Sequence, residues 1–227
     1  MLIQDVKGIN KDILNAIKKG EQIEFMSKSI VLASGSRARR EIMDESGISH
    51  IVIPNTLDEE KAKIEFGLKE ELELNSVCEY VKWLSKQKAQ TISSNIKNAI
   101  ILSGDTVVYF DGKILEKPKT IEDARHMLNL LSNNIHRIIS GVTIIDTEIE
   151  KVDNFSVVSE VVMSQVEPEL LARLLENDDT YTHAGAYNIS DLLSNHIEIG
   201  SGFYDNAKGF PLEVIKGKLV DDFSYEL

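Results

Sequence analysis

An acidic residue interrupts an apolar, β-branched segment near the middle of the chain. Asp105 lies in the sequence Ser103-Gly104-Asp105-Thr106, and the apolar run resumes directly after it. A carboxylate in a buried strand is costly unless it is paired, hydrogen-bonded or holding a cation. The following Asp111-Gly112 predicts a hairpin that returns Lys117 towards Asp105. A metal-binding carboxylate and an anion-binding ammonium group on one hairpin indicate phosphate chemistry.

A second candidate for anion binding lies where a short strand ends and a helix over residues 37–45 begins. Ser36 is placed to cap this helix, which leaves backbone N–H groups at the helix start pointing outward. Arg37, Arg39 and Arg40 add positive charge and bidentate donors to that helix terminus. Together these groups favour phosphate binding. The alternative is a capped helix with a solvated basic face.

Other charged residues are less specific on their own. Asp58 and Glu59 precede a helix, where carboxylates either hold a hard cation or merely complement the helix N-terminus. Lys88 lies on a long predicted helix that also carries Lys86 and Trp83. In isolation, a solvated helix face is the ordinary interpretation of these lysines.

Several classes of site are excluded by the sequence. The single Cys78 forms no internal disulfide and offers no cluster for zinc, and the five histidines are scattered without paired spacing. A Walker-type phosphate loop, a complete dinucleotide fingerprint and a Gly-x-Ser-x-Gly motif are all absent. These absences argue against a Walker-type ATPase or kinase and weaken a serine-hydrolase interpretation.

The composition is that of a globular protein with a sizeable core. The 227 residues are 42% hydrophobic and 27% charged, and the formal net charge of -12 argues against a nucleic-acid partner. No apolar run approaches the roughly 18 residues that span a bilayer. Residues 1–30 lack the zones of a signal peptide. We therefore expect a cytoplasmic protein with neither a nucleic-acid nor a membrane partner.

The order of strand and helix patterns predicts one α/β domain with a mixed sheet. Residues 1–28 are expected to form an extension with a short amphipathic helix capped by Asn10, and residues 29–227 the main domain. Strands are predicted over residues 30–33, 51–54, 100–110, 138–146 and 156–165, with short strands near Tyr187 and Ile197. Helices are predicted over residues 37–45, around 77–88, from 120 to 131, from 168 to 176 and after Gly209.

Taken in order, these motifs resemble the Maf family of nucleoside triphosphate pyrophosphatases. The matching blocks are LASGSRARRE (32–41), LDE (57–59), WLSKQKA (83–89), SGDTVV (103–108), LEKP (115–118), Leu131-Ser132 with His136, HAGAY (183–187) and GFPL (209–212). The resemblance implies hydrolysis between the α and β phosphates of a nucleoside triphosphate. It also implies an elongated mixed sheet flanked by helices with a central cleft, a divalent cation such as Mg²⁺ or Mn²⁺, and often a homodimer.

The resemblance also implies roles for individual residues. Asp105 matches the proton acceptor, and Asp105 and Glu59 are the expected metal ligands. The other catalytic residues that it implies are Lys88, Lys117 and Glu59. The expected substrate-binding residues are Ser36, Ala38, Arg39, Arg40, Thr106, Tyr187 and Ser190.

Two of the three positions that select the base depart from the family pattern. Ala38 replaces the usual arginine and Ser190 replaces the glutamine of the subgroup that favours dTTP and UTP, whereas Thr106 is retained. Losing these donors predicts a relaxed or shifted substrate range, directed at non-standard or modified nucleotides with pyrimidines among the candidates. One alternative is a nucleotide-responsive interaction protein that affects cell division with little turnover. Another is an enzyme acting on a different phosphorylated metabolite.

Overall fold

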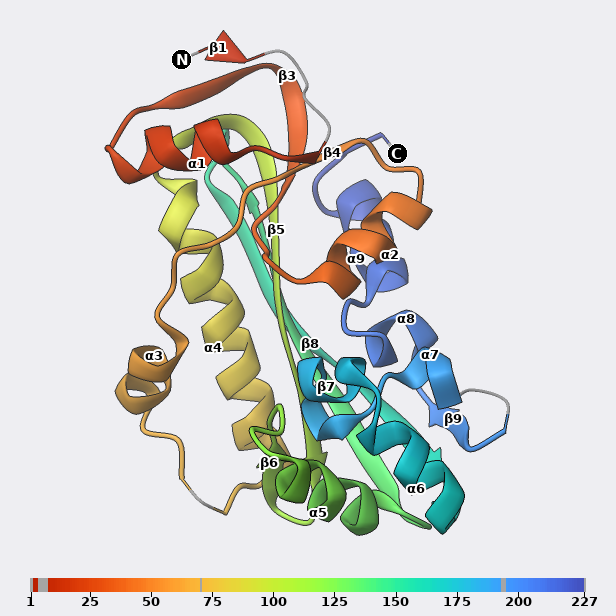
Figure 1. Ribbon diagram of the computed structural model, residues 1–227. Coiled ribbons are helices and arrows are strands. Elements are labelled where there is room, and N and C mark those ends of the chain that lie inside the picture. The colour runs from red at the N-terminus through yellow and green to blue at the C-terminus, as the bar shows by residue number, and fades with distance from the viewer. Residues whose placement is uncertain (1, 4–7, 70, 193–194, 227) are drawn as a thin grey trace.

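The computed structural model describes residues 2–3, 8–69, 71–192 and 195–226, which form one α/β domain (Figure 1). The strands are β1 (Leu2–Ile3), β2 (Gly8–Ile9), β3 (Ile23–Leu32), β4 (His50–Val52), β5 (Ile96–Phe110), β6 (Lys113–Leu115), β7 (Ile135–Asp146), β8 (Lys151–Met163) and β9 (Ile197–Ser201). The α-helices are α1 (Lys11–Lys18), α2 (Arg37–Glu45), α3 (Glu59–Phe66), α4 (Leu74–Ser93), α5 (Ile121–Leu131), α6 (Pro168–Leu175), α7 (Ile189–Leu192), α8 (Tyr204–Ala207) and α9 (Leu212–Asp221). Two 3₁₀ helices, η1 (Asp178–Thr182) and η2 (Ala184–Ala186), join α6 to α7.

Within these ranges the strands form one nine-stranded sheet in the order β2-β4-β3-β5-β7-β8-β9. β2, β4, β3 and β5 pair in parallel, whereas β7, β8 and β9 are antiparallel to their neighbours. β1 pairs with β3, and β6 pairs with β5. The long strands β5, β7 and β8 run the length of the molecule with helices on both sides (Figure 1). The predicted elongated mixed sheet flanked by helices is therefore confirmed.

The two faces of β5 meet different helices. Ile101 packs in the cluster that contains α1 and the end of α4, and Val107 packs against the middle of α4. Ile100 and Leu102 pack instead with α2 and α9. Because side chains alternate along a strand, Asp105 shares the α4 face with Ile101 and Val107, whereas Thr106 projects to the opposite face.

Local sequence signals placed several elements correctly. The Ser36 side chain caps α2, the Asn10 side chain caps α1, and Thr120 forms a reciprocal capping box with Asp123 at α5. The predicted hairpin joins β5 to β6, and Asp111 and Gly112 both have positive φ, at 46° and 77°. Such dihedrals are those of the tight turn that Asp-Gly favours.

The first part of the chain packs on the sheet. Ile13 and Ile17 of α1 are buried in the same cluster as Ile23 and Phe25 of β3. β3 begins at Ile23, earlier than the strand predicted over residues 30–33. Its buried Ile23 and Phe25 alternate with exposed side chains, and Ile23 and Glu24 pair with the start of β5. β3 thus crosses the expected boundary between residues 28 and 29.

Two local predictions were wrong. No strand forms near Tyr187 in the described chain, since Gly185 and Ala186 adopt left-handed conformations with φ of 73° and 64° that end an extended segment. Glu59 was expected to precede a helix, but it lies in the first turn of α3, which Asp58 caps. Among the helices of the described ranges, none is long and apolar enough to cross a membrane.

Candidate active site

The candidate site lies at an unpaired stretch of the β5 edge. β3 pairs with β5 as far as Leu102, and β6 begins to pair with the same strand at Val108. Between these two partners, residues 103–107 have β7 as their only sheet neighbour in the described chain. The backbone groups of Gly104 and Thr106 that point away from β7 are therefore left for other partners. Asp105 is at the centre of this gap.

On the α4 face, a lysine joins two carboxylates. Lys88 Nζ lies 2.6 Å from Asp105 Oδ1 and 2.8 Å from Glu59 Oε1. The Lys88 side chain is 5% exposed and that of Asp105 11%, whereas that of Glu59 is 59% exposed. Buried charges are tolerated when they are paired, and this pairing accounts for an acid inside a strand. We call these three residues the Lys88 trio.

A glycine in the neighbouring strand lets α4 approach closely enough to form the trio. Gly141 of β7 is paired directly with Asp105. A Cβ at position 141 would lie 2.1 Å from the backbone C and O atoms of Val81 in α4, so only glycine fits there. Lys88 follows Val81 by about two helical turns, which brings its side chain over Asp105. An isolated glycine inside the β-branched segment 138–146 was the available sequence signal for this contact.

On the opposite face, Arg39 is hydrogen-bonded to β5 and to the Gly209 carbonyl. Its Nε donates to the Gly209 carbonyl and its Nη2 donates to Thr106 Oγ1, both at 3.0 Å. Thr106 Oγ1 also lies 2.8 Å from Ser140 Oγ. A Cβ on Gly104 would approach the Phe210 ring to 3.1 Å and Arg39 Nε to 3.3 Å, so the glycine leaves room for both side chains. A buried arginine across the strand from the trio supplies the fixed positive charge that a phosphate ligand requires.

Burial and nearby acids act in opposite directions on Arg39. Loss of solvent lowers the pKa of its guanidinium group below the usual value, and the charges of Asp105 and Glu59 oppose that shift. This coupling links the two faces of β5 electrostatically, because Asp105 and Glu59 belong to the Lys88 trio. The Arg39 side chain is 9% exposed, so these charges interact with little screening by solvent.

The start of α2 retains free backbone donors. Ser36 Oγ accepts from Arg39 N at 3.4 Å, and Ser34 Oγ accepts from Ser36 N at 3.1 Å. In the described part of the chain, the N–H groups of Arg37 and Ala38 have no hydrogen-bond acceptor. Ser36 thus serves first as the helix cap, and the two free amides are the groups that an anion could contact.

The structure brings together some of the predicted site residues but not all of them. Arg40 and Ala38 are half-buried in the first turn of α2, beside Arg39. Lys117 is exposed, and β6 ends at Leu115, so the hairpin pairing stops before it. Within the described ranges Lys117 takes part in no ion pair, whereas its neighbour Glu116 pairs with Lys63. Ser190 is exposed in the short helix α7.

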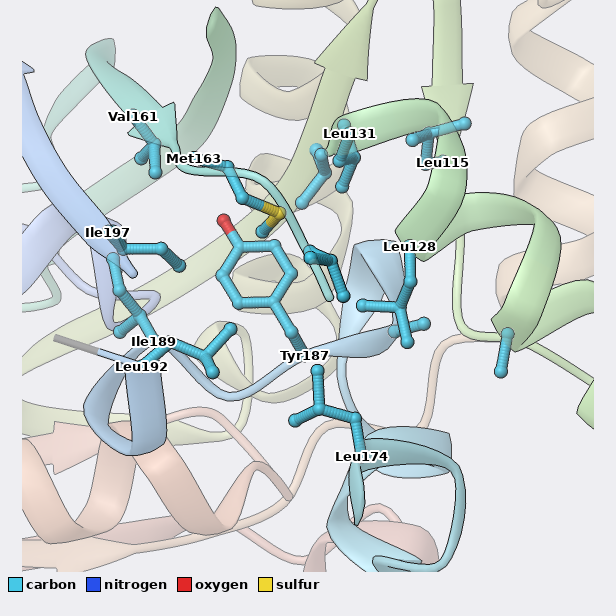
Figure 2. Close-up of a cluster of buried hydrophobic side chains, with 14 of the residues drawn as sticks. Leu115, Leu128, Leu131, Val161, Met163, Leu174, Tyr187, Ile189, Leu192 and Ile197 are labelled. Atoms are coloured by element: carbon cyan, nitrogen blue, oxygen red, sulfur yellow. The ribbon is translucent and has the colours of Figure 1, made fainter. Parts of the chain in front are cut away.

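Tyr187 is in the hydrophobic core and not at the site. The residue is 4% exposed, and its ring lies among the apolar side chains of β8, α5, α6 and α7 (Figure 2). The hydroxyl lies 2.6 Å from His136 Nε2, and the two rings meet edge to face. Burial lowers the pKa of His136 to about 4 and raises that of Tyr187. The expected substrate contact of Tyr187 is corrected accordingly, because neither its ring nor its hydroxyl is open to a ligand.

Besides Gly141, the sequence analysis missed several residues that complete the site. Ser140 and the Gly209 carbonyl orient Thr106 and Arg39, as described above. Tyr80 lies on the same face of α4 as Lys88, and burial together with the charges of Asp105 and Glu116 raises its pKa. Gly209 lies in the GFPL block, so the motif marked it. The contact of its carbonyl with Arg39 joins segments 170 residues apart in sequence, and no local pattern predicts it.

The donor set is compatible with a hard divalent cation. Asp105 and Glu59 present carboxylate oxygens to one point, the Lys88 ammonium group, and such oxygens suit Mg²⁺ or Mn²⁺. In the chain as described, no group of three or more His, Cys, Asp or Glu side chains is arranged to hold a metal. Mg²⁺ commonly binds through one or two carboxylates completed by water and substrate phosphates. The residues present therefore fit a cation that shares its ligands with a phosphate.

The fold and the site define an α/β protein that combines a buried acid–lysine pair, a buried arginine and free helix amides around one strand edge. The chain belongs to the Maf family, since the family model described as Maf-like protein matches residues 29–221. It is 36% identical over 193 residues to a dTTP/UTP pyrophosphatase of Clostridium botulinum (strain Eklund 17B / Type B), covering 85% of this chain and 98% of that protein.

Two further relatives have the same name. A dTTP/UTP pyrophosphatase of Clostridium perfringens (strain 13 / Type A) is 36% identical over 184 residues, with 81% of this chain and 91% of that protein covered. One from Dictyoglomus turgidum is 34% identical over 202 residues, with 89% of this chain and 100% of that protein covered. The similarity therefore extends over nearly the whole of these relatives.

Proposed function

We propose that the chain is a nucleoside triphosphate pyrophosphatase, which hydrolyses the bond between the α and β phosphates to release a nucleoside monophosphate and pyrophosphate. The observation that carries this proposal is the Lys88 trio at the open edge of β5, with Arg39 buried on the opposite face of the strand. The names of the similar proteins support the same reaction. No observation favours an interaction protein without turnover.

Each residue has a chemical task in this proposal. Asp105 accepts a proton from the water that attacks phosphorus, while the bond to the bridging oxygen breaks and pyrophosphate leaves with the bonding electron pair. Lys88 and Arg39 offset the negative charge of the phosphates, and the free amides of Arg37 and Ala38 donate to phosphate oxygens. Because Arg39 is held by two hydrogen bonds, its charge is in position before the substrate arrives.

A divalent cation completes the proposed site. Asp105 and Glu59 are the side chains that would hold Mg²⁺ or Mn²⁺ together with phosphate oxygens. When bound, such a cation lowers the pKa of water in contact with it and offsets charge on the phosphates. Glu59 is the more exposed of the two ligands, so it can adjust its position as the cation and substrate bind.

The proposed substrate range differs from that of the relatives. Ala38 offers only a methyl group at the start of α2, and Ser190 is exposed in α7 with a short hydroxyl side chain. A site that lacks polar readers of the base discriminates less between bases. We therefore propose acceptance of modified or non-standard nucleotides, pyrimidines included, in addition to dTTP and UTP.

A product-resolved screen tests these proposals. Canonical and modified triphosphates are incubated with the protein with and without Mg²⁺ or Mn²⁺, and pyrophosphate and orthophosphate are measured separately. We expect pyrophosphate with a cation and only background without it. Orthophosphate as the main product would contradict the proposed bond cleavage. Strict selectivity for dTTP and UTP would contradict the relaxed base preference and leave the reaction type intact.

A further inference from the structure

The Lys88 ammonium group lies at the point where a divalent cation would bind. Its Nζ contacts one oxygen of Asp105 at 2.6 Å and one oxygen of Glu59 at 2.8 Å. These distances are those of charge-assisted hydrogen bonds, so both carboxylates already have a cationic partner. The Asp105 carboxylate and the ammonium group are almost completely buried, which strengthens their attraction relative to that in water.

We propose that Lys88 blocks the cation site in the nucleotide-free protein, so that a divalent cation binds only together with the triphosphate. This inference rests on the proposed function and adds an order of binding to it. Two negative charges and one positive charge leave the Lys88 trio with a single net negative charge, which attracts a free divalent cation weakly. A cation must also displace the ammonium group from both carboxylates.

The triphosphate supplies a new anionic partner for the displaced Lys88 ammonium group. Its oxygens offer Lys88 an alternative anionic partner and offer the cation further hard ligands. Lysine suits such an exchange, since its ammonium group is a point charge on a flexible stem. Arg39 does not suit it, because its guanidinium group is fixed by Gly209 and Thr106. The site therefore combines one movable positively charged side chain, Lys88, with one fixed positively charged side chain, Arg39.

The experiment measures binding of Mn²⁺ alone to the full chain by electron paramagnetic resonance, with no nucleotide present. The test variant is Lys88→Met, and the matched control is Lys86→Met, an exposed lysine on the same helix whose loss changes the total charge equally. We expect Lys88→Met to bind Mn²⁺ at least about tenfold more tightly than the wild type. Lys86→Met should match the wild type, and the double variant Lys88→Met with Asp105→Asn should lose the gain.

A second readout uses thermal unfolding. A ligand that binds only the folded state raises the melting temperature, so Mn²⁺ should raise that of Lys88→Met and leave that of the wild type nearly unchanged. If Lys88→Met does not fold, Lys88→Gln keeps a polar group of similar length and takes its place. The wild type alone also decides the matter, because micromolar Mn²⁺ binding without nucleotide would overturn the proposal.

The outcomes separate this inference from the proposed function. Equal Mn²⁺ affinity in the wild type and Lys88→Met shows that Lys88 does not block the site, whatever the turnover. A wild type that releases no pyrophosphate from any triphosphate contradicts the proposed function, and the Mn²⁺ titration still reports on Lys88. Tighter binding in Lys88→Met, with unchanged Lys86→Met and no micromolar binding by the wild type, supports the inference.

Discussion

Two clusters of this protein hold polar side chains away from solvent, one with charged groups and the other with neutral groups. The Lys88 trio combines a buried ion pair with a second carboxylate, so it keeps a net negative charge, and it reaches the surface through Glu59. The His136–Tyr187 pair is neutral, and both of its side chains are below 5% exposed. In each cluster the shortest contact is 2.6 Å. The difference shows that a short buried hydrogen bond does not identify a site; access to solvent and unbalanced charge do.

The largest effect is expected from neutralising the acid of the Lys88 trio. Asp105→Asn keeps the shape of the side chain but removes the proton acceptor, so pyrophosphate release should fall by about 10²–10⁴-fold. The fold should persist, as measured by circular dichroism. Asp111→Asn is the control, because this exposed turn residue has a positive φ that asparagine tolerates. If Asp105→Asn turned over substrate at the wild-type rate, the Lys88 trio would be no more catalytic than the His136–Tyr187 pair.

The second prediction concerns the contact that places α4 over Asp105. Gly141→Ala sets a methyl group against the backbone of Val81, so either the helix or the strand must shift. We expect a loss of at least about 3 kcal/mol in the free energy of unfolding, together with lower activity in the protein that remains folded. Urea denaturation measures the first quantity. The control Gly217→Ala has open space around the new methyl group in α9 and should be neutral or stabilising.

The third prediction concerns how the stability that the His136–Tyr187 pair provides depends on pH. The pKa of His136 is about 4 in the folded protein, against 6.5 for a histidine exposed to water. Between these two pH values the unfolded chain therefore binds a proton that the folded chain does not. The stability provided by neutral His136 is therefore complete above pH 6.5 and falls as the pH drops towards 4, by about 3 kcal/mol in total.

Urea denaturation at pH 7 and pH 4.5 measures this loss. The double variant His136→Phe with Tyr187→Phe removes the titrating group and its partner together, so its loss over the same interval should be smaller. An identical pH dependence in the wild type and the double variant would mean that His136 titrates normally.

The smallest expected effect comes from removing the Tyr187 hydroxyl from the His136–Tyr187 pair. Tyr187→Phe leaves His136 Nε2 without its partner, which should cost about 1–3 kcal/mol of stability. The kcat/KM of the folded protein at pH 7 should stay within about twofold of the wild type. An increase in KM with unchanged stability would instead return Tyr187 to the substrate-binding role that the resemblance implies. Denaturation and steady-state kinetics on the same sample distinguish the two results.

Much of the fold was predictable because the signals were local. Ser36, Asn10 and Thr120 each cap a helix through a hydrogen bond to a residue three positions later. Asp111-Gly112 similarly determines its own turn. The start of β3 and the loss of a strand at Tyr187 were not predictable in this way. They depend on pairing with the distant start of β5 and on left-handed residues before the tyrosine.

The site was predictable in part. The motif order grouped Asp105, Lys88, Glu59 and Arg39, and the structure places the first three in contact and the fourth on the opposite face of β5. Tyr187 belongs to an equally recognisable block, yet it is buried in the core. A motif shows that a residue matters, but the same pattern arises from a role in packing and from a role in binding.

The sequence by itself determined the types of groups available, the caps that begin α1, α2 and α5, the turn between β5 and β6, and the family. Only the tertiary structure decided which charges meet. Lys88 reaches Asp105 because Gly141 lets α4 lie directly on β7, and Arg39 is fixed because Gly209 returns to it from the far end of the chain. Such contacts depend on distances between segments remote in sequence, and no local propensity encodes those distances.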